Sequence, residues 1–272
     1  MKKLIALIAS FLRALSPKEE ILVVKKGMKE GWQRKEKAEE KVIFVVNEEE
    51  TEKREYCRAA PLLNVRSSPY VSADTKIGWL AYGESVFVLR EREGWKEIVY
   101  GGANAWVSAE YLTPDEKEVF PVFVLGERNL HRSPSATKIR SYLNDEFGGE
   151  AGGLDLQSTE YVAYRVKRLG SDIIWPSERP RNGGLWADIF RRHDLYEELE
   201  VPQKHAVMCF RGGLGSRAIN DIGHVAFIES VFPDGSVRIS EANWPREGIY
   251  NERVIPQKDR EGKYKAEFVS FL

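Results

Sequence analysis

The chain has 272 residues, of which 42% are hydrophobic and 11% aromatic, and this composition supports packed cores and excludes a disordered protein. Its 41 Lys and Arg residues nearly cancel 42 Asp and Glu residues. The composition therefore provides no overall field that would favour nucleic acid or an anionic membrane as a partner.

Residues 1–55 form a charged N-terminal segment. Two lysines precede the mostly apolar run from Leu4 to Leu12, as in a secretory signal, but Arg13 interrupts the run and Pro17 follows the only small-residue site. The run is too short to span a bilayer stably, so it is either a poor signal or an amphipathic surface helix. The first alternative places the protein outside the cell or in the cell envelope, and the second leaves the cytoplasm open.

Residues 56–113 contain short β-type runs (LLNVR, SVFVLRE, WKEIVY and NAWVS) separated by turn residues, a spacing that predicts a small β-barrel. The order LNVRSSP, IGWLAYGESVFVL and EGWKEIVYGGANAWVSAEYL resembles bacterial SH3-like domains, with Ala105-Trp106 where that family usually has Gly-Trp. The resemblance implies a domain that binds cell-wall peptides or packs beside a catalytic domain. Its aromatic side chains either form a binding surface or fill the barrel core. The candidates for the surface are Trp79, Tyr82, Trp95, Trp106 and Tyr111.

Residues 114–134 are expected to be a connector, and residues 135–272 to form the second domain. Ser135 to Phe147 has helical periodicity, with Ile139 and Leu143 on one stripe. The two cysteines, Cys57 and Cys209, fit either one disulfide or two thiols, and Cys209 lies in an apolar run that predicts a buried strand.

The stretch LQSTEYVAYRVKRLG predicts a helix that begins near Ser158 and ends at Gly170. Ser158 taken alone is best interpreted as a helix N-cap, whose hydroxyl accepts a hydrogen bond from a backbone N–H group. A second pattern lies further along the chain, where alternating runs on both sides of Pro233-Asp234-Gly235 predict an antiparallel hairpin.

The hairpin carries the candidate acid–base residues. Because side chains alternate along a strand, Glu241 and Asn243 are expected on one face and near His224 of the first strand. A histidine beside a carboxylate and an amide is a general base with groups to orient it. The alternative is a hydrogen-bonded histidine on a sheet face beside a solvated Glu241.

These stretches together resemble the CHAP family of cysteine, histidine-dependent amidohydrolases and peptidases. LQSTEYVAYRV is similar to the family's GQCTWYVxxR, and GHVAFIESVFPDGSVRISEANW is similar to its GHVAxVESVxxDGSIxVSExNW. GGLWADIF, PQKHAVMCF and GIYNERVIP match three further stretches of the family, with Lys204-His205 where Gly-Asp is frequent. The resemblance implies an α+β protein in which an SH3-like barrel is followed by a papain-like domain, an antiparallel sheet packed against helices.

The resemblance also assigns roles to individual residues. It implies that His224 is the base, Glu241 orients it, Asn243 supports them, and Gln157 contributes to an oxyanion site. It implies peptidoglycan or cell-wall peptides as partners, with an amide bond of the wall as the bond that is cut. Trp186 and Trp244 are further candidates for substrate contact.

Ser158 occupies the position of the family's nucleophilic cysteine. A thiol ionises near pH 8.5 and is readily brought lower, whereas an alcohol depends wholly on proton removal during the attack. We therefore expect hydrolysis to be crippled in this sequence. The serine is an introduced substitution, a natural loss of activity, or a genuine serine variant, and the sequence leaves these alternatives open.

A binding or scaffolding protein that holds wall fragments with both domains is the rival interpretation, and Ser158 favours it. The remaining histidines, His131, His193 and His205, lack matched partners in the sequence and are expected to be structural. No spacing of ligands suggests a metal, and no Gly-rich loop suggests a phosphate-binding cofactor site. We therefore expect the protein to use no cofactor.

Overall fold

The computed structural model describes residues 53–144, 153–215 and 221–272. The charged N-terminal segment therefore lies outside the described residues as far as residue 52, and Phe147 of the expected helix also lies outside them. Within the described ranges, no helix has the length and the apolar character that a membrane crossing requires.

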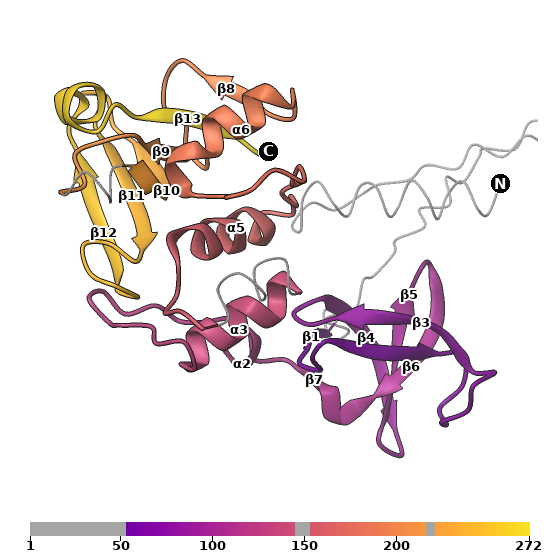
Figure 1. The fold of residues 1–272 in the computed structure, drawn as a ribbon. Coiled ribbons are helices and arrows are strands. Elements are labelled where there is room, and N and C mark those ends of the chain that lie inside the picture. The colour runs from indigo at the N-terminus through magenta and orange to yellow at the C-terminus, as the bar shows by residue number, and fades with distance from the viewer. Residues whose placement is uncertain (1–52, 145–152, 216–220) are drawn as a thin grey trace, which may run out of the picture. The chain divides into compact units, whose positions relative to one another are not determined.

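Seven antiparallel strands form the first sheet, in the order β3-β2-β6-β5-β4-β1-β7 (Figure 1). They are β1 (Lys53–Cys57), β2 (Leu62–Arg66), β3 (Lys76–Ala81), β4 (Ser85–Arg92), β5 (Trp95–Tyr100), β6 (Ala103–Ser108) and β7 (Leu112–Thr113), with a 3-10 turn at Ala109–Tyr111. Leu80, Ile98 and Val107 are fully buried in the core that these strands enclose. The SH3-like domain predicted from the β-type runs is confirmed.

A short helix, α2 (Glu116–Val119), lies in the stretch expected to be a connector. Asp115 caps it by accepting a hydrogen bond of 2.9 Å from the Lys117 backbone N–H. Val119 is fully buried, and its carbonyl accepts a hydrogen bond of 2.9 Å from the Tyr82 hydroxyl. The end of α2 is therefore packed against the SH3-like domain, whereas Val122, Val124 and Leu125 further along this stretch are exposed.

The second sheet has six antiparallel strands in the order β12-β11-β10-β9-β13-β8. They are β8 (Glu197–Leu199), β9 (Val207–Phe210), β10 (His224–Val231), β11 (Val237–Ala242), β12 (Tyr250–Ile255) and β13 (Glu267–Ser270). The helices around it are α3 (Pro134–Leu143), α5 (Ser158–Arg168) and α6 (Trp186–Arg192), with a 3-10 turn at Gly183–Leu185 and a π-helical turn at Asp259–Lys263. The predicted α+β class, with an antiparallel sheet packed against helices, is confirmed.

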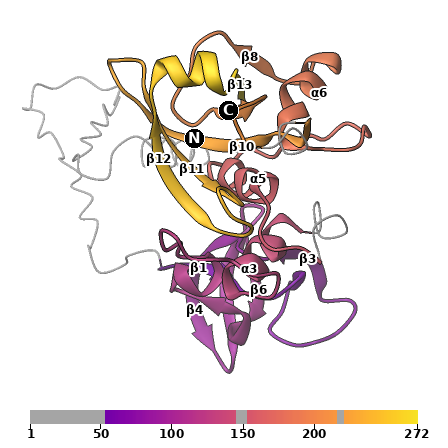
Figure 2. The same cartoon turned by 60° about the vertical axis from the view of Figure 1, so that its left-hand side comes forward.

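Both faces of the second sheet are covered. Val225 and Phe227 of β10 belong to the core that contains the buried side of α5, and α5 lies along the sheet in both views (Figures 1 and 2). Ala226 and Ile228 belong to a second core, as expected for alternating side chains. The apolar run of β10 is explained by this two-sided burial, because each face of the strand needs apolar residues.

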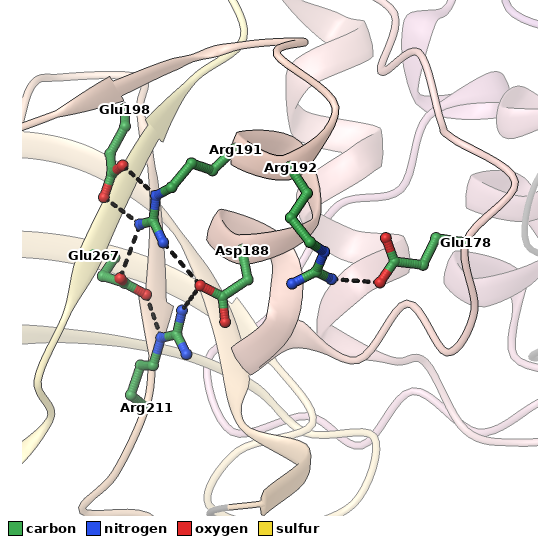
Figure 3. Close-up of polar contacts among 7 residues, drawn as sticks. All are labelled: Glu178, Asp188, Arg191, Arg192, Glu198, Arg211 and Glu267. Atoms are coloured by element: carbon green, nitrogen blue, oxygen red, sulfur yellow. Dashed lines mark hydrogen bonds and ion pairs between the residues drawn. The ribbon is translucent and has the colours of Figure 1, made fainter.

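Charged residues connect α6 to three parts of the sheet (Figure 3). Arg191 of α6 bonds Glu198 of β8 at 2.7 Å and Glu267 of β13 at 3.1 Å. Arg211, which follows β9, lies 2.6 Å from Asp188 of α6 and also pairs with Glu267. These partly exposed ion pairs fix the edge of the sheet that is remote from β11, and none of the five lines the cleft described below.

Candidate functional site

Ser158 is the first residue of α5, as predicted, and only 9% of its surface is exposed. The helix start is fixed by Glu160, whose carboxylate accepts a hydrogen bond of 3.0 Å from the Gln157 backbone N–H. Glu160 is itself fully buried, and Arg140 of α3 donates to it at 2.7 and 3.0 Å. The position of the candidate nucleophile is therefore set by a buried ion pair between two helices.

His224 is the first residue of β10, and 4% of its surface is exposed. Its Nε2 atom lies 2.8 Å from Oε2 of Glu241 on β11, which is the pairing expected from the hairpin. The strands pair with Phe227 opposite Ser240, so the histidine and the glutamate meet diagonally across the ladder. Because Nε2 is engaged, Nδ1 is the ring nitrogen with which His224 could take a proton from a nucleophile.

Glu241 is fully buried and has further partners on β12. Asn251 donates to its Oε1 atom at 3.0 Å, and the Arg253 guanidinium donates to both oxygens at 2.7 and 3.2 Å. Burial by itself would raise the pKa of the Glu241 carboxyl, but the hydrogen bonds and charges of His224 and Arg253 hold the pKa below its usual value. The carboxylate is therefore kept ionised where it meets the imidazole.

The sequence interpretation assigned no role to Arg253 or Asn251, although both lie in the closing strand of the motif. The sequence offered one signal, because residues 251 and 253 are two apart in a predicted strand and therefore lie on the same face. In the structure, Asn251 lies directly opposite Glu241 on the neighbouring strand. The Arg253 side chain is held in turn by the Tyr264 hydroxyl, which accepts a hydrogen bond of 2.9 Å from Nη1.

Asn243 lines the same cleft as His224, and its expected supporting role beside the histidine and the glutamate stays a prediction. Asn243 follows the end of β11 and has φ +67°, so the alternation of the strand does not extend to it. Its Nδ2 atom donates to Oε1 of Gln157 at 3.1 Å, and its Oδ1 atom accepts from the Gly248 N–H at 2.8 Å. Asn243 therefore fixes the residue that precedes Ser158.

Gln157 is held at both ends of its amide. Besides accepting from Asn243, it donates through Nε2 to the Asp155 carbonyl at 2.7 Å. The side chain lines the same cleft as Ser158 and His224, so its remaining amide hydrogen could face a substrate oxygen there. Its expected contribution to an oxyanion site stays a prediction.

Glycines bring the 3-10 turn that precedes α6 against the start of β10. A Cβ atom on Gly183 would lie 2.8 Å from the His224 carbonyl carbon, and one on Gly184 would lie 2.8 Å from the Cα atom of Gly223. Gly223 itself has φ +70°, which favours glycine. These contacts place the wall of the cleft directly beside the backbone of the candidate base.

A cleft of about 980 Å³ brings the predicted residues together. Ser158 and His224 line it, with Glu241 behind the imidazole. The other lining residues are Leu154, Gln157, Thr159, Arg179, Pro180, Arg181, Asn182, Gly183, Ile222, Gly223, Asn243, Trp244, Pro245, Arg246 and Glu247. A hydroxyl, an imidazole with an anionic partner, and a helix N-terminus thus meet at one solvent-accessible surface, which is the set that acyl transfer requires.

The two tryptophans proposed for substrate contact in this domain have different positions. Trp244 is half-buried, lines the cleft, and its ring centroid lies 6.1 Å from that of His224. Trp186 is fully buried in the core, and its indole N–H donates to the Arg181 carbonyl at 3.0 Å. The proposed contact between Trp186 and substrate is therefore wrong, because the ring supports the cleft wall from inside.

The aromatic residues of the SH3-like domain also separate by burial. Tyr82 is buried, whereas Trp79 is 56% exposed and Tyr111 is 41% exposed. Trp95 and Trp106 are half-buried, and the Arg90 guanidinium lies 5.6 Å from the Trp106 ring centroid. A shallow pocket of about 550 Å³ contains Trp95 and Tyr111 together with Leu62, Val71 and Arg66 among its lining residues.

Neither cysteine is an alternative nucleophile. Both are buried free thiols, and burial raises the pKa of Cys57 to about 11 and that of Cys209 to about 12.

The other three histidines have contacts of their own. His131 contacts Arg140, His193 pairs with Glu178, and the ring of His205 stacks on that of Phe227. In the described ranges, no group of His, Cys, Asp and Glu side chains has the arrangement of a metal site.

Comparison with known proteins agrees with the motifs. The family model of the CHAP domain matches residues 149–243, and that of the bacterial SH3 domain matches residues 61–113. The chain thus contains a bacterial SH3 domain followed by a CHAP domain. Asn251 and Arg253 lie beyond the matched part of the CHAP model.

A curated relative, an N-acetylmuramoyl-L-alanine amidase domain-containing protein of Staphylococcus aureus, is 36% identical over 99 residues, which are 36% of this chain and 15% of the relative. The match therefore spans a small part of that relative's length. A crystal structure of N-acetylmuramoyl-L-alanine amidase from S. aureus aligns with TM-score 0.36 and 30% identity, over 43% of this chain and 31% of that chain. An NlpC/P60 family protein from Bacillus cereus aligns with TM-score 0.32 and 18% identity, over 82% of this chain and 65% of that chain.

Proposed function

We propose that the protein is a peptidoglycan hydrolase of the amidase or endopeptidase type, in which residue 158 provides the nucleophile. The observation that carries the proposal is the cleft in which Ser158 and His224 meet, with the Glu241 carboxylate 2.8 Å from the imidazole. The CHAP match and the amidase domain named in the curated relative support an amide bond of the cell wall as the target. A secreted or cell-envelope location belongs to the same proposal.

The proposed reaction is acyl transfer. The oxygen of Ser158 attacks the amide carbon while His224 Nδ1 takes the hydroxyl proton, and the ionised Glu241 stabilises the resulting imidazolium. The leaving amine then receives that proton, and water hydrolyses the ester by the same steps. In this proposal, the oxyanion is held by backbone N–H groups at the start of α5, with Gln157 beside them in the cleft.

The same geometry predicts a weak enzyme. A helix N-terminus beside an imidazolium stabilises a thiolate strongly, but it assists an alcohol only during the attack. Ser158→Cys should therefore release new amine ends from purified peptidoglycan at least roughly tenfold faster than the serine form. Ser158→Ala is the matched control and should have no activity above that of heat-inactivated protein.

Three results of this assay have distinct meanings. A cysteine form that releases nothing, while it still binds wall material, would contradict the proposed enzyme. A serine form that cuts as fast as the cysteine form would contradict the predicted impairment and identify a genuine serine hydrolase. Mass spectrometry of the released fragments distinguishes cleavage next to the sugar from cleavage within the peptide.

A non-catalytic wall-binding protein is the second candidate, and the pocket beside Trp95 and Tyr111 favours it because it offers aromatic and aliphatic surface to a peptide. This candidate predicts that the protein sediments with insoluble peptidoglycan without cutting it. Tyr111→Ala should then release it into the supernatant. Val99→Ala, an exposed position that does not line this pocket, serves as the control.

A further inference from the structure

The cleft is lined by more arginine residues than acidic residues. Arg179, Arg181 and Arg246 line it together with a single carboxylate, that of Glu247. Glu247 has a basic neighbour, because its Oε2 atom lies 3.5 Å from Nη2 of Arg128 and its carbonyl accepts from Arg128 Nε at 3.1 Å. Arginines thus outnumber carboxylates among the lining residues, although the formal net charge of the whole chain is −1.

These arginines lie on segments that also carry the reactive groups. Arg246 follows Trp244, whose ring lies beside His224, and its own side chain is exposed. Arg181 is held across the cleft wall, since Nη2 donates to the Pro176 carbonyl at 3.1 Å and the guanidinium carbon lies 4.6 Å from the Trp175 ring centroid. Arg246 is thus close in the sequence to the tryptophan beside His224, and the Arg181 side chain is held in place by its contacts with Pro176 and Trp175.

Guanidinium groups recognise carboxylates by paired hydrogen bonds that are stronger than bonds between neutral groups. A carboxamide has a similar shape, but it carries no charge and places two donors where the arginine needs an acceptor. The lining of this cleft would therefore distinguish the two groups. It would also attract a negatively charged substrate before contact, and added salt would weaken that attraction.

We propose that the cleft selects a wall peptide that carries a free carboxylate close to the amide bond under attack, and that it discriminates against the corresponding carboxamide. Arg246 is the principal specificity residue, because it is exposed at the cleft and adjoins the Trp244 loop. This inference rests on the proposed function, since it names the substrate class of the same site.

The test uses two synthetic probes, N-acetylmuramoyl-L-alanyl-D-glutamate and its D-isoglutamine counterpart, with the γ-carboxyl group blocked as a methylamide in both. They differ only in one carboxylate or carboxamide. Calorimetric titration of the full chain, in the serine form, should show about fivefold tighter binding of the carboxylate probe at low salt. Raising the salt concentration should reduce that preference.

Two variants test whether Arg246 is responsible for the preference for the carboxylate probe. Arg246→Gln should bring the two affinities to within about twofold of each other. Arg238→Gln removes the same charge from an exposed position on β11 that does not line the cleft, and it should keep the preference. Equal binding of the two probes by the unmodified chain would overturn the inference, and so would a preference that survives in Arg246→Gln.

The proposed function is tested separately, by the Ser158→Cys assay on whole peptidoglycan. Cleavage there combined with equal binding of the probes would leave the hydrolase intact and reject the carboxylate specificity. The same two probes can also be assayed as substrates of the cysteine form, whose kcat/KM should follow the preference seen in binding. Added inorganic phosphate that competes equally well against both probes would indicate general anion binding, and that result also overturns the inference.

Discussion

At the scale of single residues, the Glu241 carboxylate joins the candidate catalytic histidine to the rest of the sheet. It has no exposed surface, and each of its oxygens is engaged by Arg253 as well as by His224 or Asn251. A buried carboxylate is stable only when its charge is compensated. Arg253 is therefore a positioning residue, which holds Glu241 where it can orient the imidazole.

Arg253→Gln should lower the free energy of unfolding by about 3 kcal/mol, because it leaves a buried carboxylate with less compensation. In the background of Glu241→Gln, where the buried carboxylate charge has been removed, the same substitution should cost less than about 1 kcal/mol. Urea denaturation of the four proteins in this double-mutant cycle measures both values. An equal cost in the two backgrounds would mean that Arg253 acts through its packing on Tyr264 and not through Glu241.

At the scale of elements, the 3-10 turn before α6 is bound to the start of β10 by the near contact of two backbones. Gly184→Ala would place its new methyl group 2.8 Å from the Gly223 Cα atom and 3.1 Å from the Phe210 carbonyl oxygen, so one segment must move. We expect a loss of about 1–3 kcal/mol and a changed NMR signal of the His224 ring. Gly262→Ala meets no atom within 4 Å and should change neither. A Gly184→Ala protein with both properties unchanged would show that this contact is not needed to place the base.

Sequence reasoning was most successful where a local pattern was sufficient. The helix expected from about residue 158 to 170 is observed as Ser158–Arg168, and the hairpin around residues 233–235 is observed with His224 and Glu241 in contact. The predictions were less successful where the position of a residue depends on tertiary contacts between segments that are distant in the sequence. Trp186 is buried by packing between distant segments, and the bond from Asn243 to Gln157 joins residues far apart in the sequence, which no local pattern could indicate.

At the scale of the whole molecule, the helix layer is held on the second sheet by a partly buried ion pair as well as by apolar packing. Arg165 of α5 pairs with both oxygens of Glu229 on β10, and the Ser240 hydroxyl donates to the same carboxylate at 2.5 Å. Burial opposes ionisation of Glu229, yet the bonds from Arg165 and Ser240 hold its pKa below the usual value. The pKa values of Glu241, Asp188 and Glu198 are lowered as well. The stability of several elements is therefore expected to depend on pH in the same way as that of the bond between Arg165 and Glu229.

A lowered pKa in the folded state means that the unfolded chain binds more protons on acidification. The stabilisation from Glu229 is therefore fully present above the ordinary glutamate pKa, near 4.3, and is lost as the pH falls through the lower folded value. Thermal melting should show a Tm that changes little between pH 7 and 6 and falls steeply below about pH 4.5. Glu229→Gln should lower Tm at pH 7 and make that fall shallower, whereas Glu200→Gln at an exposed position should retain the original profile. If Glu229→Gln left the steepness unchanged, the acid sensitivity would have to come from the other carboxylates, and the bond between α5 and the sheet would not depend on this charge.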